Sequence, residues 1–322
     1  MTERLIIGSR ASKLALTQSN WVADELCRFH PGLEVEIVEI KTTGDVKLGA
    51  SLSEIGGKGA FTKELEDALL EERCDLAVHS LKDLPTELPE GLRVGCTPTR
   101  ENTDDALIYH NRIGTVDDDS DPLGFLKQGA VVGTSSLRRK AQLLHTRPDL
   151  RVVEWRGNVD TRLRKLKDGD ADAIILAAAG LLRMGLIDLS TRPDRVDASF
   201  DSLALRAPAW LPAVGQGALG IEIREGDSRL LRLLAPLHDA ATFAAAAAER
   251  AFLNRLGAGC VAPVGALASV PEGSTIRMTG RVLSGEGITS VQHTAKGKIN
   301  EPEKLGVEVA DWCLKHGADK LI

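Results

Sequence analysis

A basic stretch of the sequence is GTSSLRRK at 133–140, in which hydroxyl residues precede arginines at a predicted strand-to-helix junction. Backbone N–H groups and the helix dipole favour an anion at such a junction, and the planar guanidinium of arginine pairs with carboxylate or phosphate. The phosphate-binding pattern GxxxxGK[ST] is absent, so a ligand rich in carboxylates fits at least as well as a phosphate. The candidate anion-binding residues here are Thr134, Ser135, Ser136, Arg138 and Arg139.

A second stretch suited to chemistry, HSLKDLP at 79–85, follows an apolar run that predicts a buried strand. Pro85 closes the stretch, so we expect His79, Lys82 and Asp83 to emerge at the end of that strand. A carboxylate beside an ammonium group in a cleft is suited to proton transfer. The alternative is an ordinary turn in which the aspartate caps a helix.

Cys260 lies among glycines in LGAGCVAPVG at 256–265, and glycines leave a neighbouring side chain accessible. No histidine or basic residue stands next to the thiol, so a cysteine-protease arrangement is not indicated. The alternative is a small buried side chain. The five cysteines are odd in number and never form CxxC, which predicts neither a disulfide framework nor a metal site.

The elements that position these residues occur twice in the same order. Each copy begins with a strand-like run that opens a helix, continues past a proline into a strand, and ends with an acidic residue before a buried-type strand. Alternating strands and helices predict two α/β lobes with parallel strands, whose loops enclose a cleft. A loose likeness between any two α/β segments is the alternative. The matched segments are 5–16 with 130–144, 30–45 with 147–160, and 74–85 with 171–182.

The remainder of the chain predicts a third, α+β domain. The acidic, turn-rich stretch 115–124 falls between the two copies and is interpreted as a surface loop or lobe boundary. After 211–224 come an alanine-rich helical stretch, hairpin-like strands from about 261 to 296 and a closing helix near 302–316.

The charge balance of the 322 residues excludes some classes of function. With 46 acidic and 40 basic residues the formal net charge is -6, whereas a general nucleic-acid binder needs a broad basic face. The longest apolar run, 173–182, is too short to span a bilayer. We therefore expect a cytoplasmic protein that binds neither nucleic acid nor membranes.

Eight motifs, in this order, resemble those of the porphobilinogen deaminases, also called hydroxymethylbilane synthases. The resemblance runs from Leu5 to the end of the chain and is strongest before residue 225. Each motif alone is weak, but eight in order are specific. They are SRAS (9–12), GGKGAF (56–61), HSLKDLP (79–85), GTSSLRR (133–139), RGNVDTRL (156–163), AAAGLLR (177–183), LPAVGQGA (211–218) and GAGC (257–260).

The resemblance implies a transferase of tetrapyrrole (haem) biosynthesis. Such an enzyme joins four porphobilinogen molecules through linear polypyrrole intermediates, releases ammonia and hydrolyses the product to hydroxymethylbilane. The resemblance implies a cytoplasmic monomer with a dipyrromethane cofactor held by a thioether to Cys260. It also implies two periplasmic-binding-protein-like lobes around a cleft and a smaller α+β domain with the cysteine. The implied bounds are 1–100 with 204–221 for domain 1, 101–203 for domain 2 and 222–322 for domain 3.

Asp83 matches the catalytic aspartate of that family. Its implied task is to help protonate the leaving amine, hold the pyrrole N–H and stabilise the azafulvenium cation. Lys58 lies in a glycine-rich segment, about 43–60, that resembles the family's mobile lid. Together with Lys58, the positions implied to bind cofactor or substrate are Arg10, Ser12, Gln18, Ser80, Lys82, Thr134, Ser135, Ser136, Arg138, Arg139, Arg156, Arg162 and Arg183.

The sequence departs from the family pattern in a few places. Ala258 stands where many members have a second glycine, Thr43 and Glu54 replace basic residues of some relatives, and 187–208 is longer than in many members. These departures bear on the lid and leave the core roles in place.

Two other functions compete with this one. A two-lobed binding module could use the same arginines to hold a dicarboxylate or sulfate, but it would give Cys260 no role. A lysine-based enzyme could form a Schiff base at Lys82 or Lys58 with a carbonyl substrate.

Overall fold

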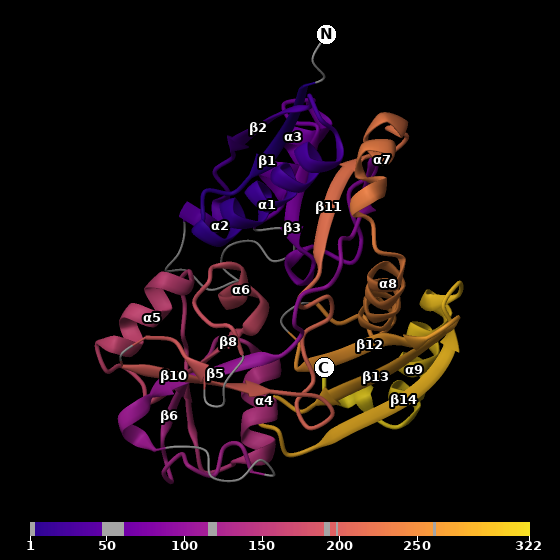
Figure 1. Cartoon of the computed structure of the whole chain (residues 1–322). Helices are drawn as coiled ribbons and strands as arrows, with labels where there is room; N and C mark the ends of the chain where they lie inside the picture. The colour runs from indigo at the N-terminus through magenta and orange to yellow at the C-terminus, as the bar shows by residue number, and fades with distance from the viewer. Residues whose placement is uncertain (1–3, 47–60, 115–120, 190–193, 198, 260–261) are drawn as a thin grey trace.

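The computed structural model describes residues 4–46, 61–114, 121–189, 194–197, 199–259 and 262–322. They form sheets of five, six and three strands, each packed against helices. Figure 1 shows the first sheet at the top, the second at the lower left and the third at the lower right, with helix α8 (Ala240–Arg255) between the first and the third. The expected α/β class, two lobes plus a smaller C-terminal α+β domain, is confirmed.

The first lobe has the strand order β2-β1-β3-β11-β4. Its elements are β1 Arg4–Ser9, α1 Lys13–Phe29, β2 Glu34–Glu39, α2 Thr43–Val46, α3 Lys63–Leu70, β3 Leu76–Ser80, the 3-10 turn η1 Leu81–Asp83, β4 Leu92–Cys96, β11 Leu219–Arg224, α7 Ser228–Leu234 and η3 Ala235–Leu237. β1 pairs in parallel with β2 and β3, whereas β11 is antiparallel to β3 and β4. Val22 and Leu230 of α1 and α7 pack on one face of the sheet, and Leu65 of α3 packs on the other.

The second lobe has the order β7-β6-β8-β5-β10-β9. Its elements are β5 Asp105–His110, η2 Asn111–Ile113, β6 Val131–Gly133, α4 Leu137–Thr146, β7 Arg151–Val153, α5 Val159–Lys167, β8 Ala173–Ala177, α6 Ala178–Arg183, β9 Asp194–Arg195 and β10 Phe200–Leu205. β6 is parallel to β7 and β8, and β5 is antiparallel to β8 and β10. Leu143 of α4 is buried on one face, and Leu166 and Leu181 of α5 and α6 are buried on the other.

The two lobes share one topology, which confirms the predicted repeat. β1, β2 and β3 hold the positions in the first sheet that β6, β7 and β8 hold in the second. In each sheet the strand beside this unit is antiparallel and comes from elsewhere in the chain. In the first sheet it is β11, which follows the second lobe in the chain. In the second sheet it is β5, which precedes the other strands of its own sheet. The chain therefore crosses twice between the lobes.

Those crossings lie near the expected boundaries at 204–221 and 222, which remain predictions. Ala204 and Leu205 pair with β5, so the second sheet extends past residue 203. β11 continues to Arg224, and α7 buries Leu230 and Leu233 in the core of the first lobe. Apolar side chains of α7 complete the cover of the first sheet.

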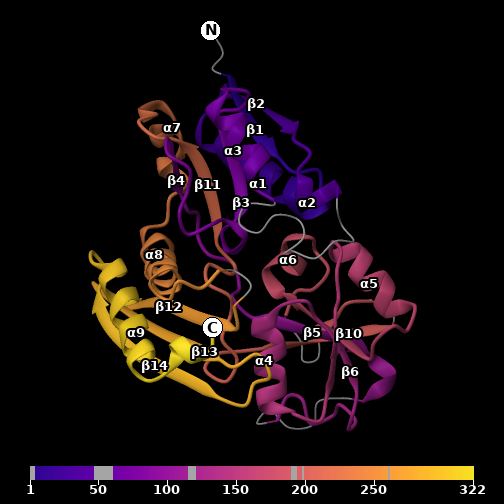
Figure 2. The same cartoon turned by 180° about the vertical axis from the view of Figure 1, so that it is seen from behind.

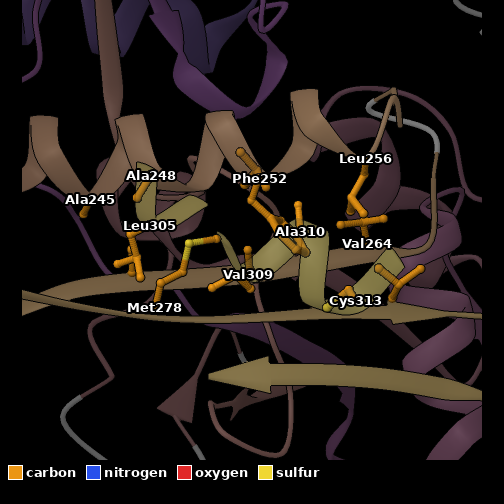
Figure 3. Close-up of a cluster of buried hydrophobic side chains, with 14 of the residues drawn as sticks. Ala245, Ala248, Phe252, Leu256, Val264, Met278, Leu305, Val309, Ala310 and Cys313 are labelled. Atoms are coloured by element: carbon orange, nitrogen blue, oxygen red, sulfur yellow. The ribbon is translucent and has the colours of Figure 1, made fainter. Parts of the chain in front are cut away.

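The third domain packs α8 and α9 (Pro302–Lys315) on an antiparallel sheet of β12 (Val264–Glu272), β13 (Thr275–Leu283) and β14 (Ser290–Lys298), with η4 (Ala318–Lys320) at its end. Figure 3 shows Phe252 of α8 and Val309 of α9 among the side chains of its core. Gly306 lets the helices approach closely, because a Cβ there would lie 2.1 Å from the carbonyl oxygen of Ala248. Asp239 begins α8 by accepting a hydrogen bond from the Thr242 N–H at 2.7 Å.

Candidate active site

The predicted site residues gather where the parallel strands of the two lobes end. In the first lobe they follow β1 and β3, and in the second they follow β6 and β7 or end α6, the helix after β8. Arg183 crosses between the lobes, because its Nη2 donates to the Gly217 carbonyl at 2.7 Å. Figure 1 shows α5 and α6 on the side of the second lobe that faces the first. The common topology thus brings the two sets of loops together.

Packing and a backbone hydrogen bond at Leu81 fix the segment that carries Lys82 and Asp83. The Leu81 side chain is buried, and its N–H donates to the Ala218 carbonyl at 3.0 Å. Gly215 has φ +72°, and a Cβ there would lie 3.3 Å from the backbone nitrogen of Lys82. The packing and the left-handed backbone therefore both favour glycine. Lys82 is half-buried and Asp83 is exposed. The carboxylate is therefore open to a ligand on a fixed backbone.

This carboxylate interacts electrostatically with cations of both lobes. Burial lowers the pKa of the Lys82 ammonium to about 8; Asp83 opposes that shift, and Arg139 adds to it. Burial also lowers the pKa of Arg162 to about 10, and there too Arg139 adds to the shift while Asp83 opposes it. Asp83 thus acts on a lysine of its own lobe and an arginine of the other.

Asp105, at the start of β5, binds both arginines of the GTSSLRR motif. Arg138 Nη1 donates to Asp105 Oδ2 at 2.7 Å and to the Leu211 carbonyl at 2.7 Å. Arg139 donates to Asp105 Oδ1 from Nε at 3.1 Å and from Nη2 at 2.8 Å. Trp210 and Gln216 add further donors to the same carboxylate. Burial favours the protonated acid, but the two arginines hold the pKa of Asp105 well below its usual range.

The hydroxyl residues of that motif shape the start of α4. Ser136 caps the helix by accepting from the Arg139 N–H, and Thr134 Oγ1 accepts from the Ser136 N–H at 3.2 Å. Ser135 Oγ accepts from the Trp155 N–H at 2.9 Å. A hydroxyl that accepts a hydrogen bond still has its own O–H to donate, so these contacts are compatible with ligand binding.

The first-lobe candidates also have internal partners. Gln18 is buried on α1, and its Nε2 donates to Ser80 Oγ at 2.9 Å. Ser12 Oγ caps α1 by accepting from the Ala15 N–H at 3.3 Å. The Arg10 guanidinium lies over the Phe61 ring, 4.4 Å from the ring centroid.

Two second-lobe arginines are anchored close to their own helix. Arg156 pairs with Glu154 at 2.6 Å, and Arg162 Nε donates to the Gly157 carbonyl at 2.7 Å. Cys260 and Lys58 lie outside the described residues, as does most of the proposed lid, of which only 43–46 is described, as α2.

Asp105, Gln216 and Glu249 are the residues that sequence reasoning missed. Glu249 on α8 accepts from Arg100 at 2.7 and 3.0 Å and from the backbone N–H groups of Gly215 and Ala268. Only the Gln216 position had a signal, since it falls in the LPAVGQGA motif. Asp105 follows another aspartate and precedes a strand, a pattern typical of a solvated turn.

The fold and the site define a two-lobed α/β protein that gathers basic side chains from both lobes around an exposed aspartate. Residues 5–232 match the family model described as "Porphobilinogen deaminase, dipyromethane cofactor binding domain", and residues 243–315 match "Porphobilinogen deaminase, C-terminal domain". The chain belongs to the porphobilinogen deaminase family. The enzyme class and the dipyrromethane cofactor expected from the motifs are thereby confirmed.

Curated relatives agree over nearly the whole chain. The porphobilinogen deaminase of Syntrophotalea carbinolica is 48% identical over 318 residues, which cover 99% of this chain and 95% of that protein. The porphobilinogen deaminase of Bacillus cereus strain AH820 is 49% identical over 319 residues, which cover 99% of this chain and 97% of the relative.

One solved structure is a more distant match. The BenM effector binding domain with benzoate is 13% identical with a TM-score of 0.42, over 73% of this chain and 90% of that one. Within the described residues no helix is long and apolar enough to cross a membrane.

Proposed function

We propose that Asp83 is the catalytic carboxylate of this porphobilinogen deaminase and that Cys260 carries its dipyrromethane. The observation that carries the proposal is the exposed Asp83 carboxylate, placed on a fixed backbone among the cations Lys82 and Arg162. An exposed carboxylate in a basic site is suited to a reaction in which positive charge develops on the substrate as an amine leaves.

The residues present fit a cofactor that bears carboxylates. Lys82 and Arg162 are each unfavourably buried and lie near the like charge of Arg139, which lowers the pKa of both, and bound carboxylates would offset both effects. When bound, a dipyrromethane would supply the free pyrrole carbon to which the first substrate is joined, and so the start of the growing chain. The thiol of Cys260 would hold it covalently.

The chain's own groups would bind, orient and move a proton. Asp83 would accept a hydrogen bond from the pyrrole N–H and help deliver a proton to the leaving amine. The remaining residues proposed to bind carboxylates of cofactor or substrate are Arg10, Ser12, Gln18, Lys58, Ser80, Thr134, Ser135, Ser136, Arg138, Arg139, Arg156, Arg162 and Arg183.

Porphobilinogen is the substrate expected of the family, and we propose that the enzyme works in the cytoplasm as a monomer without nucleic acid or membrane partners. The family resemblance supports these finer statements, and the acidic net charge of -6 supports the exclusion of nucleic acid. Light scattering of the purified chain would test the monomer, because a mass of twice 34.5 kDa would contradict it.

Intact mass spectrometry followed by peptide mapping tests the site. The expected result is an added mass of two linked pyrrole units on the peptide that contains Cys260. If the purified protein is unmodified, incubation with porphobilinogen is expected to add that mass. Persistent absence after incubation, or attachment at another residue, would contradict the assignment.

A further inference from the structure

The guanidinium of Arg250 binds the chain directly after Asp83. Its Nη1 donates to the Leu84 carbonyl at 3.1 Å, and its Nη2 donates to the carbonyls of Pro85 and Thr86. Three successive carbonyl groups thus meet one planar fork of donors, an arrangement that a lysine cannot reproduce. Arg250 lies on α8, which packs in the third domain, whereas the bound loop belongs to the first lobe.

The charge of Arg250 is part of this contact. Burial lowers its pKa to about 10, and Glu222 on β11 opposes the shift. The group therefore stays cationic at neutral pH. Glu222 in turn lies 2.9 Å from Nε2 of His79, the residue before Ser80 on β3. Arg250 is thus bound to the loop after β3 and also interacts electrostatically with the carboxylate of Glu222 in the first sheet.

The helix that carries Arg250 also leads to Cys260. α8 ends at Arg255, and the cysteine follows a few residues later. Glu249, the residue before Arg250, fixes the same helix to Arg100 and to the N–H of Gly215. Figures 1 and 2 show α8 lying between the first lobe and the third sheet. One helix therefore contacts the Asp83 loop and, in the sequence, ends five residues before the cysteine.

We propose that Arg250 is a positioning residue for condensation: it sets the place of the Asp83 carboxylate relative to the pyrrole unit carried on Cys260. This inference rests on the function proposed above for those two residues. Arg250 would touch neither substrate nor cofactor and would act through the carbonyls of Leu84, Pro85 and Thr86. A displacement of about 1 Å at a reacting group can reduce a rate by roughly 10²-fold. Loss of these contacts is therefore expected to lower turnover.

The test compares Arg250→Ala with Arg255→Ala, one turn further along α8. Arg255 pairs with Asp311 at 2.6 Å and is about half exposed, so its loss is expected to leave turnover unchanged. Arg250→Ala is expected to lower kcat by roughly 10- to 100-fold with KM within about 2-fold, because orientation is lost while the carboxylate-binding residues remain. Rates are to be measured well below the Tm of each variant, so that only folded enzyme is compared.

Rescue by a small guanidinium separates positioning from simple support of the fold. Arg250 lines a groove of about 700 Å³ between the first lobe and α8, through which methylguanidinium could reach the vacated site. Added methylguanidinium is expected to recover part of kcat in Arg250→Ala and to leave Arg255→Ala unchanged. A wild-type kcat in Arg250→Ala would overturn the proposal, and so would a loss of kcat that methylguanidinium does not relieve.

The result is distinguishable from failure of the proposed function. Mass spectrometry of each variant is expected to show the same dipyrromethane on Cys260 as in the wild type, because Arg250 does not hold the cofactor. If the wild-type chain itself is not modified at Cys260, the proposed function fails. If the wild type is modified and active but Arg250→Ala matches its kcat, only the positioning role fails.

Discussion

Lys82 and Asp83 are adjacent in sequence but differ in environment. The lysine is half-buried with a pKa of about 8, and the aspartate is exposed at the edge of the same turn. Substitutions at the two positions are therefore expected to have different effects. Replacement of Asp83 removes a reactive group, whereas replacement of Lys82 also changes packing.

Asp83→Ala is expected to reduce turnover while leaving the fold intact. Loss of a positioned proton-transfer group reduces rates by about 10²–10⁴-fold, and exposed substitutions change stability by only about 0.5 kcal/mol. Ammonia release and thermal unfolding measure the two effects, with the exposed Asp170→Ala as the control. Near-normal bilane synthesis by Asp83→Ala would contradict the assigned mechanism.

The Lys82 amine is expected to titrate separately from other lysines. After reductive methylation with a ¹³C label, NMR should show one dimethyl-lysine signal with a midpoint near pH 8, and Lys82→Arg should remove it. Because Asp83 raises the pKa of Lys82, Asp83→Asn should move the midpoint lower still. A midpoint near 10.5, the ordinary value, would show that the ammonium is not buried.

The helices and strands that hold these residues were predictable because both lobes repeat one pattern. Apolar strand runs, glycine at the strand end and a hydroxyl cap mark β1 with α1 and β6 with α4, and these signals are local. The crossing strands were not predictable in this way, since β5 and β11 enter sheets built from distant segments. For the same reason the sequence indicated the anion-binding character of Arg138 and Arg139 but not their shared partner Asp105.

Asp105→Asn is expected to destabilise the second lobe. It would leave Arg138 and Arg139 without a buried carboxylate, a change that reduces stability by about 3–5 kcal/mol. Urea unfolding at pH 7 measures the loss. The neighbouring Asp104→Asn is the control, because Asp104 pairs with a largely exposed Arg206 and such a pair contributes about 0–1 kcal/mol.

The same variant has a predicted pH dependence. The folded-state pKa of Asp105 is lowered from 3.8, so its contribution is complete above pH 3.8 and declines as the pH falls below that value. The stabilities of wild type and Asp105→Asn should differ by a constant amount between pH 5 and pH 7 and should converge in more acidic solution. A difference that persists unchanged in acid would show that the carboxylate charge is not the cause.

In the whole molecule, the third domain contacts both lobes. Arg281 donates to the carbonyls of Pro208 and Ala209, and the Gly287 carbonyl lies 2.7 Å from Nδ1 of His145 on α4. On the other side, Glu249 of α8 binds Arg100. The sequence predicted a third domain from its alanine-rich helical stretch and the hairpin-like strands that follow. These contacts, however, join residues more than 70 positions apart and carry no local signal.

Glu249→Gln is expected to uncouple the third domain from the lobes. Glu249 is fully buried, and its loss would leave the Arg100 cation without a carboxylate partner, with only the Gln216 carbonyl to accept from its side chain, and would place an amide where two backbone N–H groups now donate. Breaking a buried pair of this kind reduces stability by about 3–5 kcal/mol. Because the contact joins separate cores, we expect unfolding to lose its single cooperative transition rather than only shift in temperature.

Tryptophan fluorescence can follow each part, because Trp21 lies in the first lobe, Trp155 in the second and Trp312 in the third domain. In Glu249→Gln variants that keep one of these tryptophans, the Trp312 signal should change at a lower temperature than the Trp155 signal, whereas in the matching wild-type background the two should coincide. Glu308→Gln, on the exposed face of α9, is the control and should unfold as the wild type does. Coincident transitions in Glu249→Gln would mean that the contacts of Arg281 and the Gly287 turn with the second lobe suffice to keep the three parts one cooperative unit.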